Sequence, residues 1–226
     1  MNKSLIKDIV DWDTVNWSKA IPFWEKHATL NQKPLKCLEL GCNNGGLSLW
    51  LAQKGHEVVC SDLENPEMKA KSRHEKYGEL QISYQAINAL EIPFKNEFDI
   101  IVFKSILGGV SRGDNQKNKK AAVDQIHKAL KPGGKLLFAE NLTASKMHQF
   151  LRKHFIKWGA DWNYLQMDEV DWLFSDFNKI NYKTVGFFGA FGRSESQRKL
   201  LGKIDSVIDP ALGSKIQYIL IGVAEK

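Results

Sequence analysis

A glycine-rich turn behind an acidic residue is the part of this sequence best suited to chemistry. Glu39 lies near the end of an apolar run over residues 35–40, and Gly41 and Gly45 follow before a helical pattern over residues 47–54. Glycines let the backbone take positive φ and approach a ligand closely, and the helix start offers unpaired N–H groups. A carboxylate so near would repel a phosphate. The pattern therefore favours a ligand with a positive end, such as an amino acid or a sulfonium, and its alternative is a plain strand-to-helix connection.

A second acidic residue strengthens the binding interpretation. Asp62 ends the short apolar run 58–61, and it stands roughly 20 residues after the glycine turn, the spacing at which a carboxylate reaches ribose hydroxyls in nucleotide-binding folds. The continuous apolar run 98–103 indicates a strand buried on both faces. Residues 130–138 end a helix, turn at Pro132 and Gly133, and begin another strand.

The elements that position these residues alternate between strand and helix. Strands are predicted over 36–40, 57–61, 82–86, 98–103 and 135–140, with helices over 46–54, 66–77 and 117–130. Such alternation predicts a doubly wound α/β fold with parallel strands and right-handed crossovers. Its ligands bind beyond the carboxyl ends of the strands.

In this order and spacing the elements resemble class I S-adenosylmethionine-dependent methyltransferases, over roughly residues 35–140. The stretches that carry the resemblance are residues 39–45, Asp62, Asn88 with Ala89, residues 98–102 and residues 130–134. The resemblance implies a Rossmann-like, mostly parallel seven-stranded sheet with a C-terminal antiparallel hairpin and helical lid segments. It also implies S-adenosyl-L-methionine as the cofactor.

The resemblance further assigns cofactor contacts position by position. The methionine end of the cofactor would contact the turn at Glu39, Gly41, Cys42, Asn43 and Gly45. Its ribose would contact Asp62 and Leu63 at the end of the second strand, and its adenine would contact Asn88 and Ala89 after the third strand. Its sulfonium would lie near Lys104 and Ser105, beyond the fourth strand.

Two departures from the family pattern matter. Asn43 replaces the middle glycine of the turn, and asparagine tolerates left-handed backbone better than most residues. After the fourth strand, where many relatives carry Leu-Glu-His-Val, this chain has Leu-Gly-Gly-Val at 107–110. The missing acid or base predicts an open corner at Gly108 and Gly109 that admits a bulky acceptor, with Trp158 as a further acceptor contact.

A hydroxyl acceptor needs a base, and the base must then come from elsewhere. A positioned base contributes roughly 10²–10⁴-fold to the rate. His148 in the suspected lid and Glu140 at the end of the fifth strand rank first, ahead of Asp114 and Lys104. The alternatives are a packing role for the histidine and a capping role for Glu140.

The flanking segments are expected to complete one domain over residues 1–226. Residues 1–34 are expected to form an aromatic helical cap, and residues 35–140 are expected to form the cofactor-binding core. Residues 141–226 are expected to form a lid segment and the final strands. Aromatic and basic residues interleave over 147–158, which indicates either a lid that can touch a membrane surface or a packed helix with a solvated face. The final strands are predicted over 182–191 and 218–224, with a helix over 194–208 between them.

Composition limits the remaining choices. A net charge of +6 permits an acidic partner without identifying one. Three cysteines, no signal pattern and no apolar run near the ~18 residues of a membrane span favour a reduced, cytoplasmic protein. No cluster suggests a metal, so none is predicted, and the sequence does not indicate an oligomeric state.

These observations predict a methyltransferase that acts on a hydroxyl of a small, sugar or lipid-linked acceptor. The sugar rests on a looser likeness of residues 140–142 and 188–193 to methyltransferases of bacterial surface-polysaccharide synthesis. Nucleic acid is a less favoured acceptor, because the Asn/Asp-Pro-Pro-Tyr signature of amino-methyltransferases is missing after residue 103. The alternatives are an RNA methyltransferase and a non-catalytic S-adenosylmethionine-binding module.

Overall fold

A seven-stranded sheet forms the centre of the computed structural model, which describes residues 2–31, 33–113, 115–155 and 161–226. The strand order is β3-β2-β1-β4-β5-β7-β6. The strands are β1 Lys36–Leu40, β2 Glu57–Asp62, β3 Ile82–Ala86, β4 Phe98–Lys104, β5 Leu130–Asn141, β6 Lys179–Val185 and β7 Ile219–Glu225.

Strand directions within the sheet are mixed. β1 to β5 pair in parallel, whereas β7 runs antiparallel to both of its neighbours, β5 and β6. The predicted fold class is confirmed, including the antiparallel strand near the C-terminus. The order reverses between β1 and β4, so their carboxyl ends form the crevice at which a ligand is expected.

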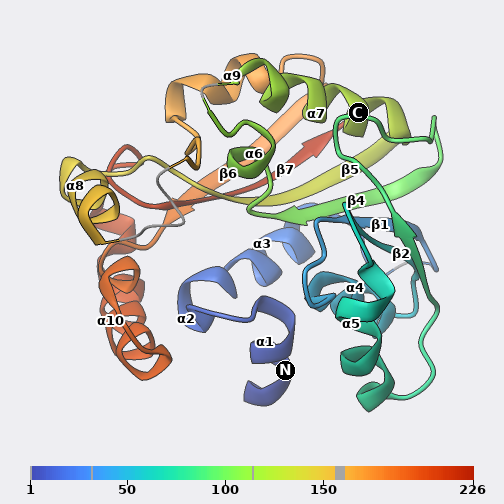
Figure 1. The fold of residues 1–226 in the computed structure, drawn as a ribbon, viewed down its shortest axis with the longest axis horizontal. Coiled ribbons are helices and arrows are strands. Elements are labelled where there is room, and N and C mark those ends of the chain that lie inside the picture. Colours follow the sequence, from blue (N-terminus) through green and yellow to red (C-terminus); the bar gives the residue numbers. More distant parts are fainter. Residues whose placement is uncertain (1, 32, 114, 156–160) are drawn as a thin grey trace.

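Helices cover both faces of this sheet (Figure 1), as a doubly wound fold requires. One face carries α1–α3, α4 and α5, and the other carries α6, α7 and α9. The helices, with short 3₁₀ segments written η, are α1 Lys3–Val10, α2 Thr14–Trp17, α3 Ala20–His27, α4 Gly46–Ala52, α5 Pro66–His74, η1 Glu75–Tyr77, α6 Leu107–Val110, α7 Lys117–Ala129, α8 Lys146–Phe155, η3 Met167–Glu169, α9 Val170–Leu173, η4 Phe188–Phe191, α10 Glu195–Ile208 and η5 Asp209–Ala211.

Side-chain alternation along the strands divides the core in two. Cys37 of β1 packs on the side of α4, whereas its neighbour Leu38 packs on the side of α7. Successive strand side chains point to opposite faces, so a strand buried on both faces reads as one apolar run. The two clusters together fix the sheet, and hence the strand ends that carry the site.

The N-terminal helices α1–α3, here called the N-terminal cap, pack on the face that also carries α4. Trp24 is buried against Trp50 of α4, and its Nε1 donates to the carbonyl oxygen of Gly222 in β7 at 3.1 Å. The predicted aromatic helical segment is therefore present.

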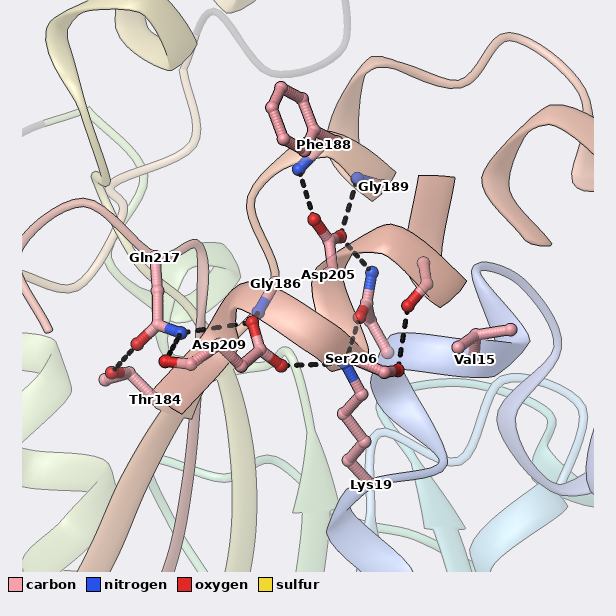
Figure 2. Close-up of polar contacts among 12 residues, drawn as sticks. Val15, Lys19, Thr184, Gly186, Phe188, Gly189, Asp205, Ser206, Asp209 and Gln217 are labelled. Carbon is pink, nitrogen blue, oxygen red and sulfur yellow. Dashed lines mark hydrogen bonds and ion pairs between the residues drawn. The ribbon is translucent and has the colours of Figure 1, made fainter. Parts of the chain in front are cut away.

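Helix α10 and the η5 turn that follows it each supply one carboxylate that ties this cap to the far end of the sheet (Figure 2). Asp205 accepts the backbone N–H groups of Phe188 and Gly189 at 2.7 and 2.8 Å and the amide of Asn16 in α2 at 2.8 Å. Asp209 pairs with Lys19 at 2.7 Å. The long connection between β6 and β7 thus anchors the N-terminal cap.

Some predicted boundaries were wrong for local reasons. The strand predicted over 182–191 ends at Val185, because Gly186 turns with φ +80 against Tyr218 and a 3₁₀ segment follows. The helix predicted over 66–77 changes to 3₁₀ after His74. The division into cap, core and lid segments stays a prediction. Within the described ranges, no helix combines the length and apolar character needed to cross a membrane.

Candidate functional site

The turn between β1 and α4 has the backbone that its sequence requires. Gly41, Asn43 and Gly45 all take left-handed conformations, with φ of 64, 48 and 72. A Cβ at Gly45 would lie 2.4 Å from Nε2 of His74, so only glycine fits there. Asn43 adopts the left-handed conformation that we expected it to tolerate.

Glu39 is fixed by the helix that follows the turn. Its Oε2 accepts the backbone N–H and the hydroxyl of Ser48 at 2.8 and 2.5 Å, and its Oε1 accepts the N–H of Leu47 at 3.2 Å. Burial raises the pKa of Glu39 to about 7, although these bonds act to lower it. A buried carboxylate at a helix N-terminus locks the turn onto α4.

Asp62 reaches across from β2 to the same turn. Its Oδ2 accepts the N–H of Asn43 at 2.9 Å, its Oδ1 accepts the N–H of Leu63 at 2.8 Å, and Lys69 pairs with it at 3.0 Å. The two carboxylates predicted from sequence therefore hold the turn from its two sides.

Two residues that sequence reasoning missed also support the turn. Buried His74 lies between Tyr84 and the carbonyl oxygen of Gly45, 2.8 Å from each, and burial lowers its pKa. Arg73 pairs with Asp11 of the N-terminal cap at 2.7 Å. Nothing in the α5 sequence marks these residues, because their partners lie far away in the chain.

A cavity of about 240 Å³, here called the loop pocket, opens where the turn meets the carboxyl end of β4. It contains six residues predicted from sequence, Glu39, Gly41, Cys42, Asn43, Lys104 and Ser105. The rest of its wall was not predicted from the sequence and consists of Ile9, Asp11, Trp12, Gly46, Leu47 and Asn141. Three of these residues, Ile9, Asp11 and Trp12, come from the N-terminal cap. Asn141, which follows Glu140 at a strand end, could have been found from its position.

Lys104 is the cation of the loop pocket. It donates a hydrogen bond to the carbonyl oxygen of Val10, and its Nζ lies 5.4 and 5.1 Å from the ring centres of Trp12 and Trp17. Burial lowers the pKa of Lys104 to about 8. Cation–π contacts stabilise the charged form, but the lysine still titrates near neutrality.

Five predicted cofactor residues do not line the loop pocket: Gly45, which belongs to the turn itself, and Asp62, Leu63, Asn88 and Ala89. Asp62 is the last residue of β2 and Leu63 follows it. Asn88 and Ala89 come shortly after the adjacent strand β3, where Ile87 donates its N–H to the carbonyl oxygen of Asp62 at 2.9 Å. Leu63 and Asn88 are exposed. Neighbouring strand ends thus bring these four residues together on one open edge.

The two residues ranked first as bases are both engaged in structural bonds. Buried Glu140 accepts the N–H groups of Leu107 and Asn141 at 2.8 and 2.9 Å, and burial raises its pKa to about 7. Buried His148 bonds through both ring nitrogens, to Ser145 at 2.7 Å and to the carbonyl oxygen of Phe187 at 2.9 Å.

Burial also lowers the pKa of His148 to about 4. Neither His148 nor Glu140 lines the loop pocket. Their roles as bases stay predictions, and His148, with both ring nitrogens bonded, would have to release a hydrogen bond to act.

The corner after β4 is closed rather than open. A Cβ on Gly108 would lie 1.9 Å from Nε1 of Trp162, and one on Gly109 would lie 3.1 Å from its ring. The indole fills the space that the glycines leave, so the prediction of an open corner was wrong. Whether Gly108 and Gly109 contact an acceptor stays a prediction, and Trp158 lies outside the described residues.

No disulfide and no metal site is found among the cysteines and acidic residues that the structure describes. Cys37, Cys42 and Cys60 are buried free thiols. Among residues 2–31, 33–113, 115–155 and 161–226, no three His, Cys, Asp or Glu side chains are arranged to hold a metal ion.

Comparison with known sequences agrees with this geometry. Residues 38–138 match the family described as "Methyltransferase domain". The chain is 34% identical over 106 residues to the ubiquinone biosynthesis O-methyltransferase of Idiomarina loihiensis, covering 46% of this chain and 41% of that protein. It is 33% identical over 141 residues to the ubiquinone/menaquinone biosynthesis C-methyltransferase UbiE of a Shewanella species, covering 58% and 53%. The chain thus spans about half the length of the curated relatives it matches.

Solved structures share the fold over more of the chain. Phosphoethanolamine N-methyltransferase 2 of Haemonchus contortus, solved with S-adenosylhomocysteine, superposes with a TM-score of 0.65 over 93% of this chain and 52% of that one, at 16% identity. A methyltransferase structure from Methanosarcina mazei superposes with a TM-score of 0.62 over 89% and 96%, at 19% identity. Residues 38–138 therefore form a methyltransferase domain that is related in sequence to ubiquinone and menaquinone methyltransferases, within a chain that has the fold of class I S-adenosylmethionine-dependent methyltransferases.

Proposed function

We propose that this protein transfers the methyl group of S-adenosylmethionine to a hydroxyl of a small or lipid-linked acceptor. The observation that carries the proposal is the loop pocket, which joins the left-handed turn Gly41–Gly45 to Lys104 and Ser105 at the end of β4. Two arguments support this location: the resemblance predicts cofactor contacts there, and sheets of this topology bind ligands at the carboxyl ends of their strands.

The residues present suit the cofactor. The positive-φ turn leaves room where a side chain would intrude. The loop pocket, at about 240 Å³, is smaller than a typical site for a whole small ligand, which needs roughly 300 Å³ or more, so it would hold one end of the cofactor. Its methionine end would lie against Gly41 and Asn43, and its adenosine would continue along the open edge at Asp62 and Asn88. The bound cofactor supplies an electrophilic methyl group.

The protein's part is then to align the acceptor, exclude water and remove a proton. Alignment alone can supply ~7–11 kcal/mol. Trp12 and Ile9 of the N-terminal cap line the loop pocket, where they would help to exclude water once both ligands are bound. Asp114 lies outside the described residues. Of the other candidate bases, Lys104 lines the loop pocket, and its lowered pKa supports a role in accepting the hydroxyl proton at Nζ.

A hydroxyl acceptor is supported by the O-methyltransferases among the relatives. Their names concern ubiquinone biosynthesis, so a phenolic quinone precursor joins the sugar in our panel of acceptors. The names of these relatives do not concern sugars, so they do not support a sugar as the acceptor. Free buried thiols support our placing of the reaction in the cytosol.

Two measurements test the proposal. Titration calorimetry with S-adenosylhomocysteine should show one site, and formation of that product from S-adenosylmethionine should require an acceptor from a panel of phenols, sugars and ethanolamine phosphate. Absence of cofactor binding would overturn the proposal. Binding without turnover of any acceptor would favour the non-catalytic module. RNA methylation with a steep salt dependence would favour the RNA alternative.

A further inference from the structure

A second cavity, of about 640 Å³, lies between α8 and the segment that enters α9, and we call it the α8 cavity. Its wall includes Thr143, Gln149, Arg152, Lys153, Trp162 and Tyr164. The volume falls within the range of roughly 300–1,000 Å³ that is typical of sites for small organic ligands. None of these residues lines the loop pocket.

Arg152 is held rigidly in the wall of this cavity. Its guanidinium lies 4.0 Å from the ring centre of Tyr164, and Nη1 donates to the carbonyl oxygens of Leu142 and Thr143 at 2.7 and 3.1 Å. These contacts use one nitrogen and one face of the guanidinium. The side chain is therefore fixed in place while part of its donor edge stays available.

The charge of Arg152 has no acidic partner in the part of the chain described. Its hydrogen bonds go to carbonyl oxygens, and no carboxylate lies within 4.0 Å of its nitrogens there. Burial accordingly lowers its pKa. A guanidinium preorganised by stacking, with donors to spare, suits two-point recognition of an oxyanion.

Neighbouring charges favour a dianion over a single carboxylate. Exposed Lys153 adds a second cation to the wall, and Arg112 lies over the ring of Trp162, 5.4 Å from its centre. Exposed Asp161 is the acidic residue in the described wall. The three cations Arg112, Arg152 and Lys153 less the one anion Asp161 leave a net charge of +2 around the cavity. A phosphate ester carries a charge of about −1.5 to −2 at pH 7, which matches this net charge better than a monoanion does.

The α8 cavity begins close to the loop pocket along the chain. Thr143 lines the cavity and Asn141 lines the loop pocket, so their Cα atoms are separated by at most ~7 Å. Trp162, in the wall of the α8 cavity, also packs on Gly108 of α6. A single acceptor would have to be of nucleotide or sugar phosphate size to extend from the loop pocket to the α8 cavity.

We propose that the α8 cavity binds the phosphoryl group of the methyl acceptor, with Arg152 as the fixed contact and Lys153 as the second cation. The assignment rests on the proposed function only in taking the ligand to be the acceptor. Anion binding itself can be tested without cofactor. The acceptor would then be an alcohol that carries a phosphate or diphosphate, either soluble or attached to a lipid.

Inorganic pyrophosphate is the first probe, measured by calorimetry on the full chain. Wild type should bind it with a dissociation constant below a few millimolar, and Arg152→Lys should weaken binding at least tenfold, since lysine keeps the charge but loses the planar fork. Because Arg152 also holds two carbonyls, Lys153→Glu serves as a second variant on an exposed position and should weaken binding by a similar factor. Lys203→Ala, an exposed cation on α10, should leave it unchanged.

Two further measurements are needed. One distinguishes a soluble phosphate from a lipid-linked one, and the other distinguishes failure of this inference from failure of the proposed function. Vesicles containing phosphatidic acid that bind tighter than pyrophosphate, in an Arg152-dependent way, would support a lipid-linked phosphate. Pyrophosphate binding equal in wild type, Arg152→Lys and Lys153→Glu would overturn the inference, as would no binding by wild type at ten millimolar. S-adenosylhomocysteine affinity is measured in the same variants and should not change. If the wild type does not bind S-adenosylhomocysteine, this result counts against the proposed function and not against the anion site.

Discussion

The carboxylate of Asp62 accepts a hydrogen bond from the backbone N–H of Asn43 at 2.9 Å, across the junction of β1 and β2. The bond holds the residue that replaces a glycine in a left-handed conformation. One side chain thus both shapes the turn and stands where the ribose of a nucleotide is expected. The remaining oxygen of Asp62 is bonded to Leu63 and paired with Lys69.

Replacing Asp62 with alanine should weaken cofactor binding. A hydrogen bond to a charged group contributes about 1.5–3 kcal/mol, which corresponds to a rise of roughly 10- to 150-fold in the dissociation constant. Titration calorimetry with S-adenosylhomocysteine measures this, and Glu64→Ala, on the exposed loop, is the matched control. An unchanged constant in Asp62→Ala would contradict the assignment of this residue.

Gly45→Ala should destabilise the protein more than Gly55→Ala does. Both glycines have positive φ, of 72 and 84, so each alanine bears a left-handed penalty of about 1–2 kcal/mol. Only at Gly45 does the new Cβ also meet His74 and Ala70, at 2.4 and 2.6 Å, which adds about 1–3 kcal/mol of overpacking. Urea unfolding of both variants checks the difference, and equal losses would show that the turn moves freely.

If Lys104 accepts the acceptor's proton, the methyl-transfer rate should rise with pH. The pKa of Lys104 is lowered to about 8, so its neutral form, the only one able to act as a base, increases as pH passes through that value. Lys104→Met should remove this inflection and slow transfer by at least a hundredfold. A wild-type rate profile that is flat from pH 7 to pH 9 would exclude the lysine.

His148→Ala should mainly reduce stability. The ring is buried, bonded through both nitrogens and packed against Phe187, Phe191 and Tyr218, so its loss leaves a cavity that costs about 2–4 kcal/mol. At temperatures where the variant stays folded, its transfer rate should lie near that of wild type. A hundredfold slower rate with unchanged cofactor affinity would instead return the role of base to His148.

The buried carboxyl of Glu140 should make stability depend on pH. Its folded-state pKa is raised from 4.5 to about 7, so the folded state binds the proton more tightly and loses stability as pH rises from about 4.5 through 7. This contribution reaches about 3 kcal/mol. Glu140→Gln cannot titrate, so the difference in unfolding free energy between wild type and variant should shrink from pH 5 to pH 8. Urea denaturation at both values measures it, and a constant difference would contradict the buried, raised pKa.

The sequence alone predicted the parts of this protein that depend on local pattern. Apolar runs at 36–40 and 98–103 became β1 and β4 because strands buried on both faces need continuous apolar side chains. Glu39, Gly41, Asn43 and Lys104 fell into one pocket because parallel strands bring their carboxyl ends to the same edge.

Only the tertiary structure decided which polar groups are free to act. His148 and Glu140 read as bases, yet distant partners, Phe187 for one and Leu107 for the other, bind their polar atoms. Trp162 likewise fills the corner beside Gly108, although the two glycines at 108 and 109 predicted open space there. Local pattern fixes backbone conformation, whereas burial and hydrogen bonding depend on residues brought together across the whole chain, and the chemistry of a side chain follows from those.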